Sequence, residues 1–265
     1  MTADSRDGVR SVQRALSLLM FFDEQHTART VRELVEAAEL PKTTVLRLIQ
    51  TLEGAGYLFS RPDGRISLGP RLIRLSRAVD RVWRLPVAVD ATMERLCERS
   101  RETVNLYVLE GYSRVCAAQK QGPHSIRYVV PVGAQLPLWG GASAKVLLAD
   151  APTDLIDLVL QQGEKDASYR AWLMHELRRV REAGVATSHG ERERGSSSVA
   201  AAIRAGDRTV AALAISGPTM RFTDLRVHEF AELLKNATRD MERSFTKDMD
   251  QEALGAVWVN TGVAR

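Results

Sequence analysis

Cysteine is scarce in this chain, with only Cys97 and Cys116 among its 265 residues. Two thiols are too few for a disulfide framework or a cysteine-based zinc site, and we expect both to be buried and inert. The nucleotide-binding patterns GxGxxG and GxxxxGKS/T are absent, and the five histidines show no metal-ligand spacing. The sequence therefore predicts neither a metal site nor a cofactor.

Long apolar runs are absent as well. No run approaches the length that would cross a bilayer, and the first ten residues, MTADSRDGVR, lack the apolar centre of a signal peptide. We therefore expect a cytoplasmic protein with no membrane partner. With 45% hydrophobic and 26% charged residues the composition is that of an ordinary globular chain, and the length suits about two domains.

The net charge is only +4, too small an excess to indicate a nucleic-acid partner by itself. Residues 40–77 nevertheless contain seven basic and two acidic side chains, a local net charge of +5. Local positive charge is what contact with DNA phosphates requires. The basic residues are Lys42, Arg47, Arg61, Arg65, Arg71, Arg74 and Arg77.

Residues 41–52 predict a helix with an apolar stripe, formed at helical spacing by Val45, Leu48, Ile49 and Leu52. The other side carries groups that can hydrogen-bond base edges or phosphates. These are Thr43, Arg47 and Gln50 opposite the stripe, with Thr44 and Thr51 beside it. Pro41 suits the first helical position, and Leu40 offers no side-chain cap, so the free N–H groups there meet either a phosphate or water.

A hairpin is expected directly after this helix. Asp63-Gly64 is a strong turn signal between predicted strands at residues 57–60 and 65–68, and Arg61 and Arg65 flank the turn. A helix with a polar face followed by a basic hairpin is typical of a winged helix-turn-helix. The alternative is a surface helix and hairpin of an unrelated α/β protein.

Two further helices are expected upstream. Ser11 can cap the first, and Thr30 with Glu33 forms a capping box that opens the second. Only Glu39-Leu40 separate the second helix from Pro41, and so short a turn is typical of a helix-turn-helix. We therefore expect residues 1–68 to form a DNA-binding domain.

A linker helix is predicted at residues 71–83, within a linker spanning residues 69–85. Its arginines lie outside an apolar seam, which we expect to pack on a second copy of the chain or, alternatively, on its own domain. The seam consists of Leu72, Leu75, Val79 and either Val82 or Trp83.

An α+β domain is expected at residues 86–249, where two long helices frame a mixed or antiparallel sheet. Helices are predicted at residues 88–101, 153–161, 167–183 and after Thr223, with a short helix after Gly141. Strands are predicted at residues 103–109, 113–120, 125–130, 199–203 and 209–216, and a proline-bearing loop at 133–139. The tail, residues 250–265, gives no clear signal.

In this order the motifs resemble the IclR family of bacterial transcription regulators. The matching segments are SVQRALSLL (11–19), LPKTTVLRLIQTL (40–52), ISLGPRL (66–72), ETVNLYVL (102–109), VGAQLPL (132–138), GASAKVLLA (141–149) and AALAISGP (211–218). The resemblance implies a winged helix, a linker helix and a GAF-like effector-binding domain. It also implies a homodimer or dimer of dimers that binds double-stranded operator DNA and responds to a small organic acid or aromatic metabolite.

The resemblance assigns roles to residues of this chain. It implies DNA contacts from the recognition helix at Lys42, Thr43, Thr44 and Arg47, to which the polar-face pattern adds Gln50 and the hairpin adds Arg61 and Arg65. It implies an effector pocket formed by Leu138, Gly141, Ala142, Ser143, Ser198, Ala214 and Ser216.

Three departures from the family pattern prevent transfer of any member's ligand. Members often have an acidic residue where this chain has Ser188-His189, a cysteine at Ser198 and a serine at Ala214. His189, beside Glu191 and Arg192, is either a pocket donor or an ordinary loop residue.

Enzymatic function has weak support. Ser143 and Lys145 could form a nucleophile and base, but no oxyanion arrangement accompanies them. The small residues at 141–143 fit a steric role better, since they let a ligand approach a helix start whose N–H groups favour a carboxylate. Ser196–Ser198 has no acid–base partner at a useful spacing. We therefore expect no catalytic residues; the alternative is a small-molecule-transforming enzyme, or a stand-alone sensor, with a residual helix-turn-helix.

Overall fold

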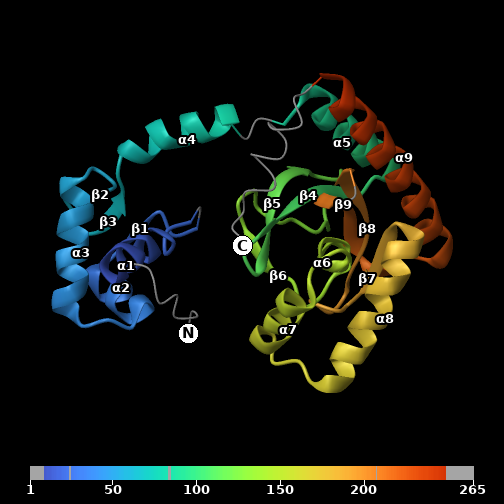
Figure 1. Ribbon diagram of the computed structural model, residues 1–265. Coiled ribbons are helices and arrows are strands. Elements are labelled where there is room, and N and C mark those ends of the chain that lie inside the picture. Colours follow the sequence, from blue (N-terminus) through green and yellow to red (C-terminus); the bar gives the residue numbers. More distant parts are fainter. Residues whose placement is uncertain (1–8, 24, 83–84, 207, 249–265) are drawn as a thin grey trace. The chain divides into compact units, whose positions relative to one another are not determined.

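The computed structural model describes residues 9–23, 25–82, 85–206 and 208–248, and the chain forms two compact units that divide between Arg84 and Leu85. In its described residues the N-terminal unit has four helices and a three-stranded antiparallel sheet in the order β1-β3-β2 (Figure 1). The elements are α1 (Arg10–Leu19), β1 (Ala28–Arg29), α2 (Val31–Ala38), α3 (Lys42–Gly54), β2 (Leu58–Ser60), β3 (Ile66–Leu68) and α4 (Arg71–Val82). The predicted winged helix-turn-helix is confirmed.

A small apolar core holds this unit together. The stripe of α3 is buried against side chains from α1, α2 and the hairpin, with Val45 fully buried and Ile49 almost so. The helical spacing of the stripe is what allows one side of α3 to be buried while the other remains exposed. The buried members of the core are Leu18, Phe22, Leu34, Val45, Ile49, Leu52, Leu58 and Ile66.

Helix starts agree with the sequence only in part. The capping box is present, because Thr30 Oγ1 accepts from the Glu33 N–H and the Glu33 carboxylate accepts from the Thr30 N–H at 2.6 Å. The expected cap at Ser11 is wrong, since α1 begins at Arg10 after the extended Val9 and Ser11 already lies inside it. Pro41 occupies the cap position of α3 and not its first turn, and no side chain caps this helix.

The C-terminal unit is built on a six-stranded antiparallel sheet in the order β6-β5-β4-β9-β8-β7. Two helices pack on one face through Met93, Leu106, Ile215 and Phe230, and three helices pack on the other through Tyr107, Ala212 and Leu177 (Figure 1). The strands are β4 (Thr103–Glu110), β5 (Ser113–Lys120), β6 (Gln135–Pro137), β7 (Val185–His189), β8 (Ser196–Ala205) and β9 (Arg208–Pro218). The helices are α5 (Val87–Ser100) and α9 (Asp224–Asp248) on the first face and α6 (Ala142–Leu148), α7 (Thr153–Gln162) and α8 (Ala167–Ala183) on the second, with a short 3-10 helix η1 (Thr219–Arg221).

In the C-terminal unit one predicted strand is wrong, and two observed strands, like β1 in the N-terminal unit, were not expected. Residues 125–130 form no strand, because prolines at 123 and 131 bracket them and side chains satisfy their carbonyls. Arg221 donates to Ile126 O at 3.1 Å, and Gln119 donates to Val130 O at 2.7 Å. The third strand is instead β6, inside the expected proline-bearing loop, where the edge position tolerates Pro137. The five-residue β7 was missed because its sequence, VATSH, has little apolar signal.

The linker helix α4 runs to Val82, and Trp83 lies outside the described residues. Along its seam Leu72 is half-buried and Leu75 is 45% exposed, while neighbouring Ile73 is 58% exposed. These apolar side chains are therefore not packed into their own unit. Within the described ranges, none of the helices combines the length and apolarity that a bilayer crossing would need.

The joint between wing and linker helix yields the first prediction. A Cβ added at Gly69 would lie 2.3 Å from the backbone oxygen of Gly56, whereas one added at Gly54 would meet nothing within 4 Å. We expect Gly69→Ala to destabilise the N-terminal unit by about 1–3 kcal/mol because backbone atoms must move apart. Urea unfolding followed by circular dichroism measures this loss.

Gly54→Ala is the matched control. Gly54 lies at the end of α3 without a positive φ angle, so alanine there should leave stability unchanged or raise it by up to about 1 kcal/mol. Equal unfolding midpoints for the two variants would contradict the role given to Gly69.

Candidate nucleic-acid interface and ligand pocket

The polar side of α3 is exposed. Lys42, Thr43, Arg47 and Gln50 are exposed and Thr44 is half-buried, while the apolar stripe of the same helix faces the core. The missing side-chain cap leaves the start of α3 open to an outside acceptor, either a phosphate or water. The N-terminal unit thus presents a helix whose exposed side carries hydrogen-bond donors.

The hairpin presents two further cations. Arg61 and Arg65 are exposed beside the turn, where Gly64 takes a positive φ of 77°. Arg61 lies 3.8 Å from the Asp63 carboxylate, an exposed and therefore weak ion pair. Both guanidinium groups remain able to meet phosphates.

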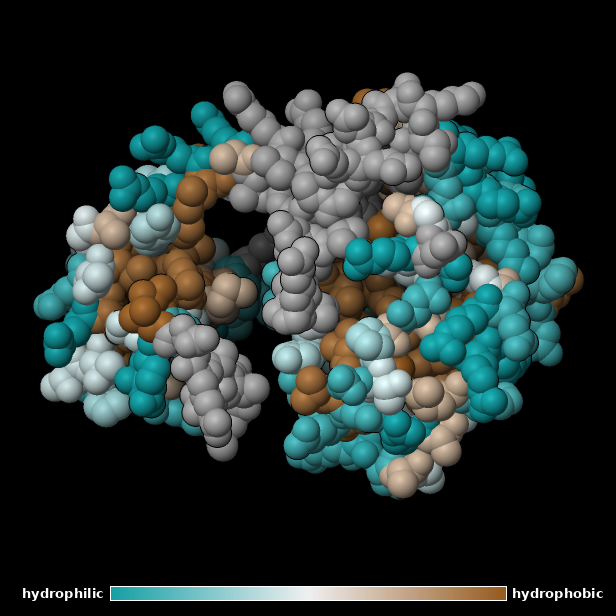
Figure 2. Space-filling view, in the orientation of Figure 1, coloured by the Kyte–Doolittle hydropathy of each residue, from teal (hydrophilic) through white to brown (hydrophobic). Residues whose placement is uncertain are grey.

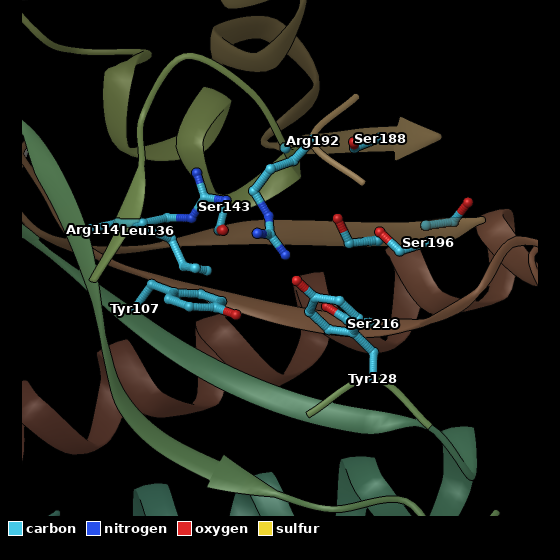
Figure 3. Close-up of a pocket in the computed structure, with 12 residues that line it drawn as sticks. Tyr107, Arg114, Tyr128, Leu136, Ser143, Ser188, Arg192, Ser196 and Ser216 are labelled. Atoms are coloured by element: carbon cyan, nitrogen blue, oxygen red, sulfur yellow. The ribbon is translucent and has the colours of Figure 1, made fainter. Parts of the chain in front are cut away.

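A pocket opens on the second face of the C-terminal sheet. Its cavity volume is about 30 Å³, and the surrounding empty space of about 380 Å³ includes open solvent (Figure 3). Every one of the six strands of the described sheet contributes to its wall. Hydroxyl groups dominate the lining, together with two arginines. The lining residues are Tyr107, Arg114, Tyr128, Leu136, Gly141, Ser143, Ser188, Arg192, Ser196, Ser197, Ser198 and Ser216.

A row of serines crosses the middle of the wall. Ser198 on β8 is the register partner of Ser188 on β7 and of Ser216 on β9. Register partners project from the same face of a sheet, so the three hydroxyl groups lie side by side on adjacent strands. Antiparallel pairing thus brings together residues that are far apart in the sequence.

Arg114 is the most deeply buried cation of the pocket. Its side chain is 3% exposed, and Nη1 donates to the backbone oxygens of Pro137 at 2.6 Å and Gly140 at 2.9 Å. Its Nε atom is buried without a hydrogen-bond partner, and no carboxylate of the described residues lies within ion-pair distance. Burial lowers the pKa of Arg114 to about 10, so the group is still cationic at neutral pH.

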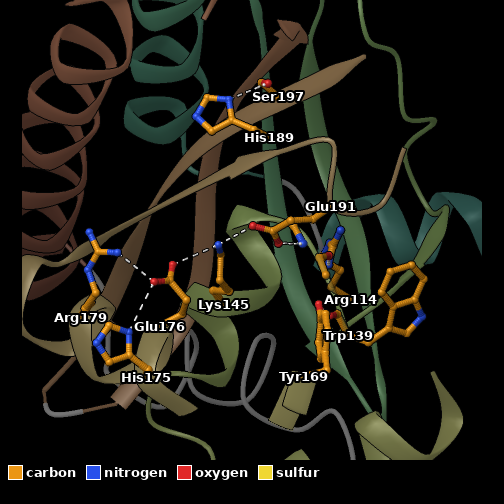
Figure 4. Close-up of polar contacts among 12 residues, drawn as sticks. Arg114, Trp139, Lys145, Tyr169, His175, Glu176, Arg179, His189, Glu191 and Ser197 are labelled. Carbon is orange, nitrogen blue, oxygen red and sulfur yellow. Dashed lines mark hydrogen bonds and ion pairs between the residues drawn. The ribbon is translucent and has the colours of Figure 1, made fainter. Parts of the chain in front are cut away.

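The start of α6 already holds a carboxylate. Glu191 Oε2 accepts from the Gly141 N–H at 2.9 Å, and Oε1 accepts from Lys145 Nζ at 2.6 Å (Figure 4). Lys145 is 2% exposed and also lies 3.5 Å from Glu176. The carboxylate expected from a ligand at this helix start is therefore supplied by the protein itself.

Gly141 has a second constraint. Its φ is +104°, and an added Cβ would lie 2.9 Å from Arg114 Nη2. The absent side chain therefore makes room for the buried guanidinium, which differs from the expected approach of a ligand to the helix.

The other sequence-predicted pocket residues divide between lining and core. Ser143, Ser198 and Ser216 line the pocket with Gly141. Leu138, Ala142 and Ala214 are buried in the core on the same face of the sheet. His189 is exposed and outside the lining, and its Nδ1 lies 3.0 Å from Ser197 Oγ.

Sequence reasoning missed the two tyrosines of the lining and gave Arg114 and Arg192 no place in it. Every second residue of β5 from Arg114 to Ala118 is buried, Cys116 included. This alternation is typical of a strand, so the sequence could have predicted that Arg114 is buried. Tyr128 gave none, because residues 125–130 were assigned to a strand. Arg192 was noticed only as a neighbour of His189.

Two family models match the chain. "Bacterial transcriptional regulator IclR C-terminal" matches residues 78–243, and "IclR helix-turn-helix domain" matches residues 11–62. The chain belongs to the IclR family. It is a transcriptional regulator of this family, with an N-terminal helix-turn-helix and a C-terminal effector-binding domain.

Relatives of the IclR family cover nearly the whole chain. The transcriptional repressor IclR of Escherichia coli is 28% identical over 92% of this chain and 93% of its own length. A crystallised IclR-family regulator from Rhodococcus sp. is 40% identical, with a TM-score of 0.60 over 92% of this chain and 96% of that one. An IclR homologue from Microbacterium hydrocarbonoxydans, crystallised with 4-hydroxybenzoate, is 25% identical, with a TM-score of 0.73 over 89% of this chain and 99% of that one.

The buried ion pair at α6 gives the second prediction. Glu191→Gln would leave Lys145 almost fully buried with only the more distant Glu176 as a counter-charge. We expect a loss of about 3 kcal/mol in the free energy of unfolding, because an uncompensated buried charge is costly. Urea unfolding of the full chain measures it.

The double variant Lys145→Met/Glu191→Gln is the control. Removing both charges should recover most of the lost stability, since an apolar side chain needs no partner. If the double variant is as unstable as Glu191→Gln, the cost lies elsewhere than in the unpaired ammonium group.

Proposed function

We propose that the protein binds operator DNA as a homodimer, or as a dimer of dimers, and that a small organic acid in the pocket of the C-terminal unit changes this binding. The observation that carries the proposal is Arg114, a buried cation beside the pocket with an unpartnered Nε and no carboxylate of the described chain within reach. Such a group gains most from an anionic ligand.

DNA contact is assigned to the exposed side of α3 and to the wing. Lys42, Thr43, Thr44, Arg47 and Gln50 would enter the major groove, while Arg61 and Arg65 would meet the backbone or the minor groove. The exposure of these side chains and the burial of the opposite stripe support this assignment.

The ligand is assigned to the pocket on chemical grounds. Guanidinium and hydroxyl groups are the donors that the carboxylate oxygens of a small organic acid accept from. The 4-hydroxybenzoate bound by the Microbacterium relative is an acid of this size class. Ser143, Ser198 and Ser216 are the predicted residues with which we expect the ligand to make contact.

Dimer formation is assigned to apolar surface on the N-terminal unit. Val12, Leu16 and Met20 recur along the exposed side of α1, and Ile73 and Leu75 are exposed on α4. Figure 2 shows apolar side chains on the visible face around α1 and beside α4. Ile73 also lines an apolar groove where the wing joins α4, together with Phe59, Leu68, Gly69, Pro70, Leu72 and Ser76. Surface of this kind favours association with a second copy.

Regulation would follow from coupling between the two binding events. A dimer places two recognition helices on half-sites about one helical turn of DNA, or a multiple, apart. A ligand that prefers one arrangement of the dimer shifts the population toward it and so changes operator affinity. Linkage makes the effect reciprocal, so the operator must change ligand affinity by the same factor.

Arg47→Ala tests the DNA assignment. We expect specific operator affinity to fall by about 1–3 kcal/mol if the guanidinium reaches a base edge. Arg61→Ala and Arg65→Ala should instead weaken binding to all sequences and reduce the salt slope by about 1 each, as expected for phosphate contacts. Gel-shift titrations at several salt concentrations measure both effects.

Arg99→Ala, an exposed change on α5, is the control and should leave DNA affinity unchanged. Unaltered operator binding by Arg47→Ala would remove α3 from the proposed interface.

Ile73→Asp tests the dimer surface. A charge on this exposed apolar side chain should weaken binding to an operator with two half-sites by about tenfold or more, because paired binding is lost. Binding to a single half-site should be unchanged. Arg77→Ala, on the same helix, should keep the two-site advantage, and a retained advantage in Ile73→Asp would exclude this face from the interface.

A further inference from the structure

Two cations from separate elements face the same pocket. Arg114 lies on β5, and Arg192 lies between β7 and β8. Each guanidinium rests over its own tyrosine ring, with Arg114 Cζ 5.6 Å from the centre of Tyr107 and Arg192 Cζ 5.5 Å from that of Tyr128. Cation–π contact fixes each group where it is, so the pocket holds two distinct positive positions (Figure 3).

The segment that carries Tyr128 is held on both sides. Arg221 donates to Ile126 O and Gln119 donates to Val130 O. Arg221 is itself fixed by Glu102, which is 1% exposed and accepts from it with both oxygens. The Tyr128 ring, over which the Arg192 guanidinium lies, is therefore held in place by the fold.

Glu191 partly offsets the charge of Arg114 but does not line the pocket. The lining contains no aspartate or glutamate, and both oxygens of Glu191 are taken by Lys145 and the Gly141 N–H. Arg192 pairs with Glu193 at 3.1 Å, but that glutamate is 58% exposed, so the pair is screened by solvent. The described residues thus leave an excess of positive charge at the site.

The two guanidinium groups also repel each other. Burial is the main cause that lowers the pKa of Arg114, and the charge of Arg192 lowers it further, while Tyr107 and Glu191 raise it. Solvent screens this repulsion in part, because Arg192 is 23% exposed. A ligand with one negative charge neutralises one arginine and leaves the other unpaired, whereas a ligand with two negative charges neutralises both.

We propose that the ligand of this pocket is a small dicarboxylate, with one carboxylate at Arg114 and the other at Arg192. The inference rests on the proposed function for taking this pocket as the effector site. The Nη1 atom of Arg114 is tied to two backbone oxygens, whereas its buried Nε atom has no partner and is the donor left for the first carboxylate. Two separate carboxylates match the two separate guanidinium groups better than a single phosphate does.

Calorimetric titration of the full chain without DNA tests the proposal with matched acids. The pairs are succinate with butyrate, glutarate with pentanoate, phthalate with benzoate, and terephthalate with 4-methylbenzoate, and inorganic phosphate is a further probe. At least one dicarboxylate should bind about tenfold or more tightly than its partner with one carboxylate, as expected for one added charge-assisted contact.

Variants of the two arginines show which carboxylate each of them binds. Arg192→Gln should abolish the preference, lowering dicarboxylate affinity about tenfold while the affinity for the matched single acid stays within about twofold. Arg114→Lys should lower the affinity for both acids, because both place a carboxylate at Arg114. Arg194→Gln changes an exposed arginine of the same segment and should behave as wild type. Circular dichroism of each variant establishes whether it is folded. If Arg114→Lys does not fold, Arg192→Gln decides the question, because Arg192 is only partly buried.

Several results would overturn the proposal: equal affinities within every pair, tighter binding of phosphate than of any dicarboxylate, or no dicarboxylate binding at about 10 mM, far weaker than a specific ligand. An equal loss for both acids in Arg192→Gln would also overturn it. These titrations contain no DNA, so their failure leaves the operator experiments intact, and the reverse also holds.

Discussion

The contact between Glu191 and the start of α6 is the interaction on which the pocket depends. One carboxylate bridges the Gly141 N–H and Lys145 Nζ, and so ties the segment between β7 and β8 to the helix that begins above the sheet. Because Arg192 follows Glu191 directly, the same contact determines where this arginine enters the pocket. Lys145, nearly fully buried, pairs with two glutamates, and a buried ammonium group without such partners would destabilise the fold.

The two faces of the C-terminal sheet have different roles: one packs against helices, and the other carries the pocket. One face packs against α5 and α9 with large apolar side chains, and the other carries small and hydroxyl side chains near α6. Alternation along each strand allows both, since neighbouring residues project to opposite faces. Ser216, for example, lines the pocket, while Ile215 beside it is fully buried in the opposite core.

Local signals were enough to predict the helices and the hairpin of the N-terminal unit, whereas β1 was missed because it pairs with the distant β3. The capping box at Thr30, the stripe of α3 and the Asp-Gly turn each act within a few residues, so the sequence shows them directly. The α+β class of the second unit followed from the order of helices and strands. The strand predicted at residues 125–130 was wrong because side chains from distant elements, Gln119 and Arg221, satisfy its backbone.

The pocket was harder to predict, because its chemistry arises from pairing between distant segments. Ser198 and Ser216 came from the family resemblance, whereas their alignment with Ser188 depends on strand register. Arg114 and Arg192 are 78 positions apart, and only the folded sheet brings both to one pocket. The carboxylate at the helix start was anticipated as a ligand group, but its source is Glu191, which spacing alone could not reveal.

The serine row has a further consequence for how such a regulator changes during evolution. A hydroxyl group can turn about one bond to become donor or acceptor, so Ser188, Ser198 and Ser216 form an adjustable surface on a rigid sheet. Replacing any of them with alanine or cysteine alters the hydrogen-bond pattern by a single atom and leaves the backbone in place. The pocket can therefore acquire a preference for a new metabolite in small steps, while the DNA-reading unit and its operator stay the same.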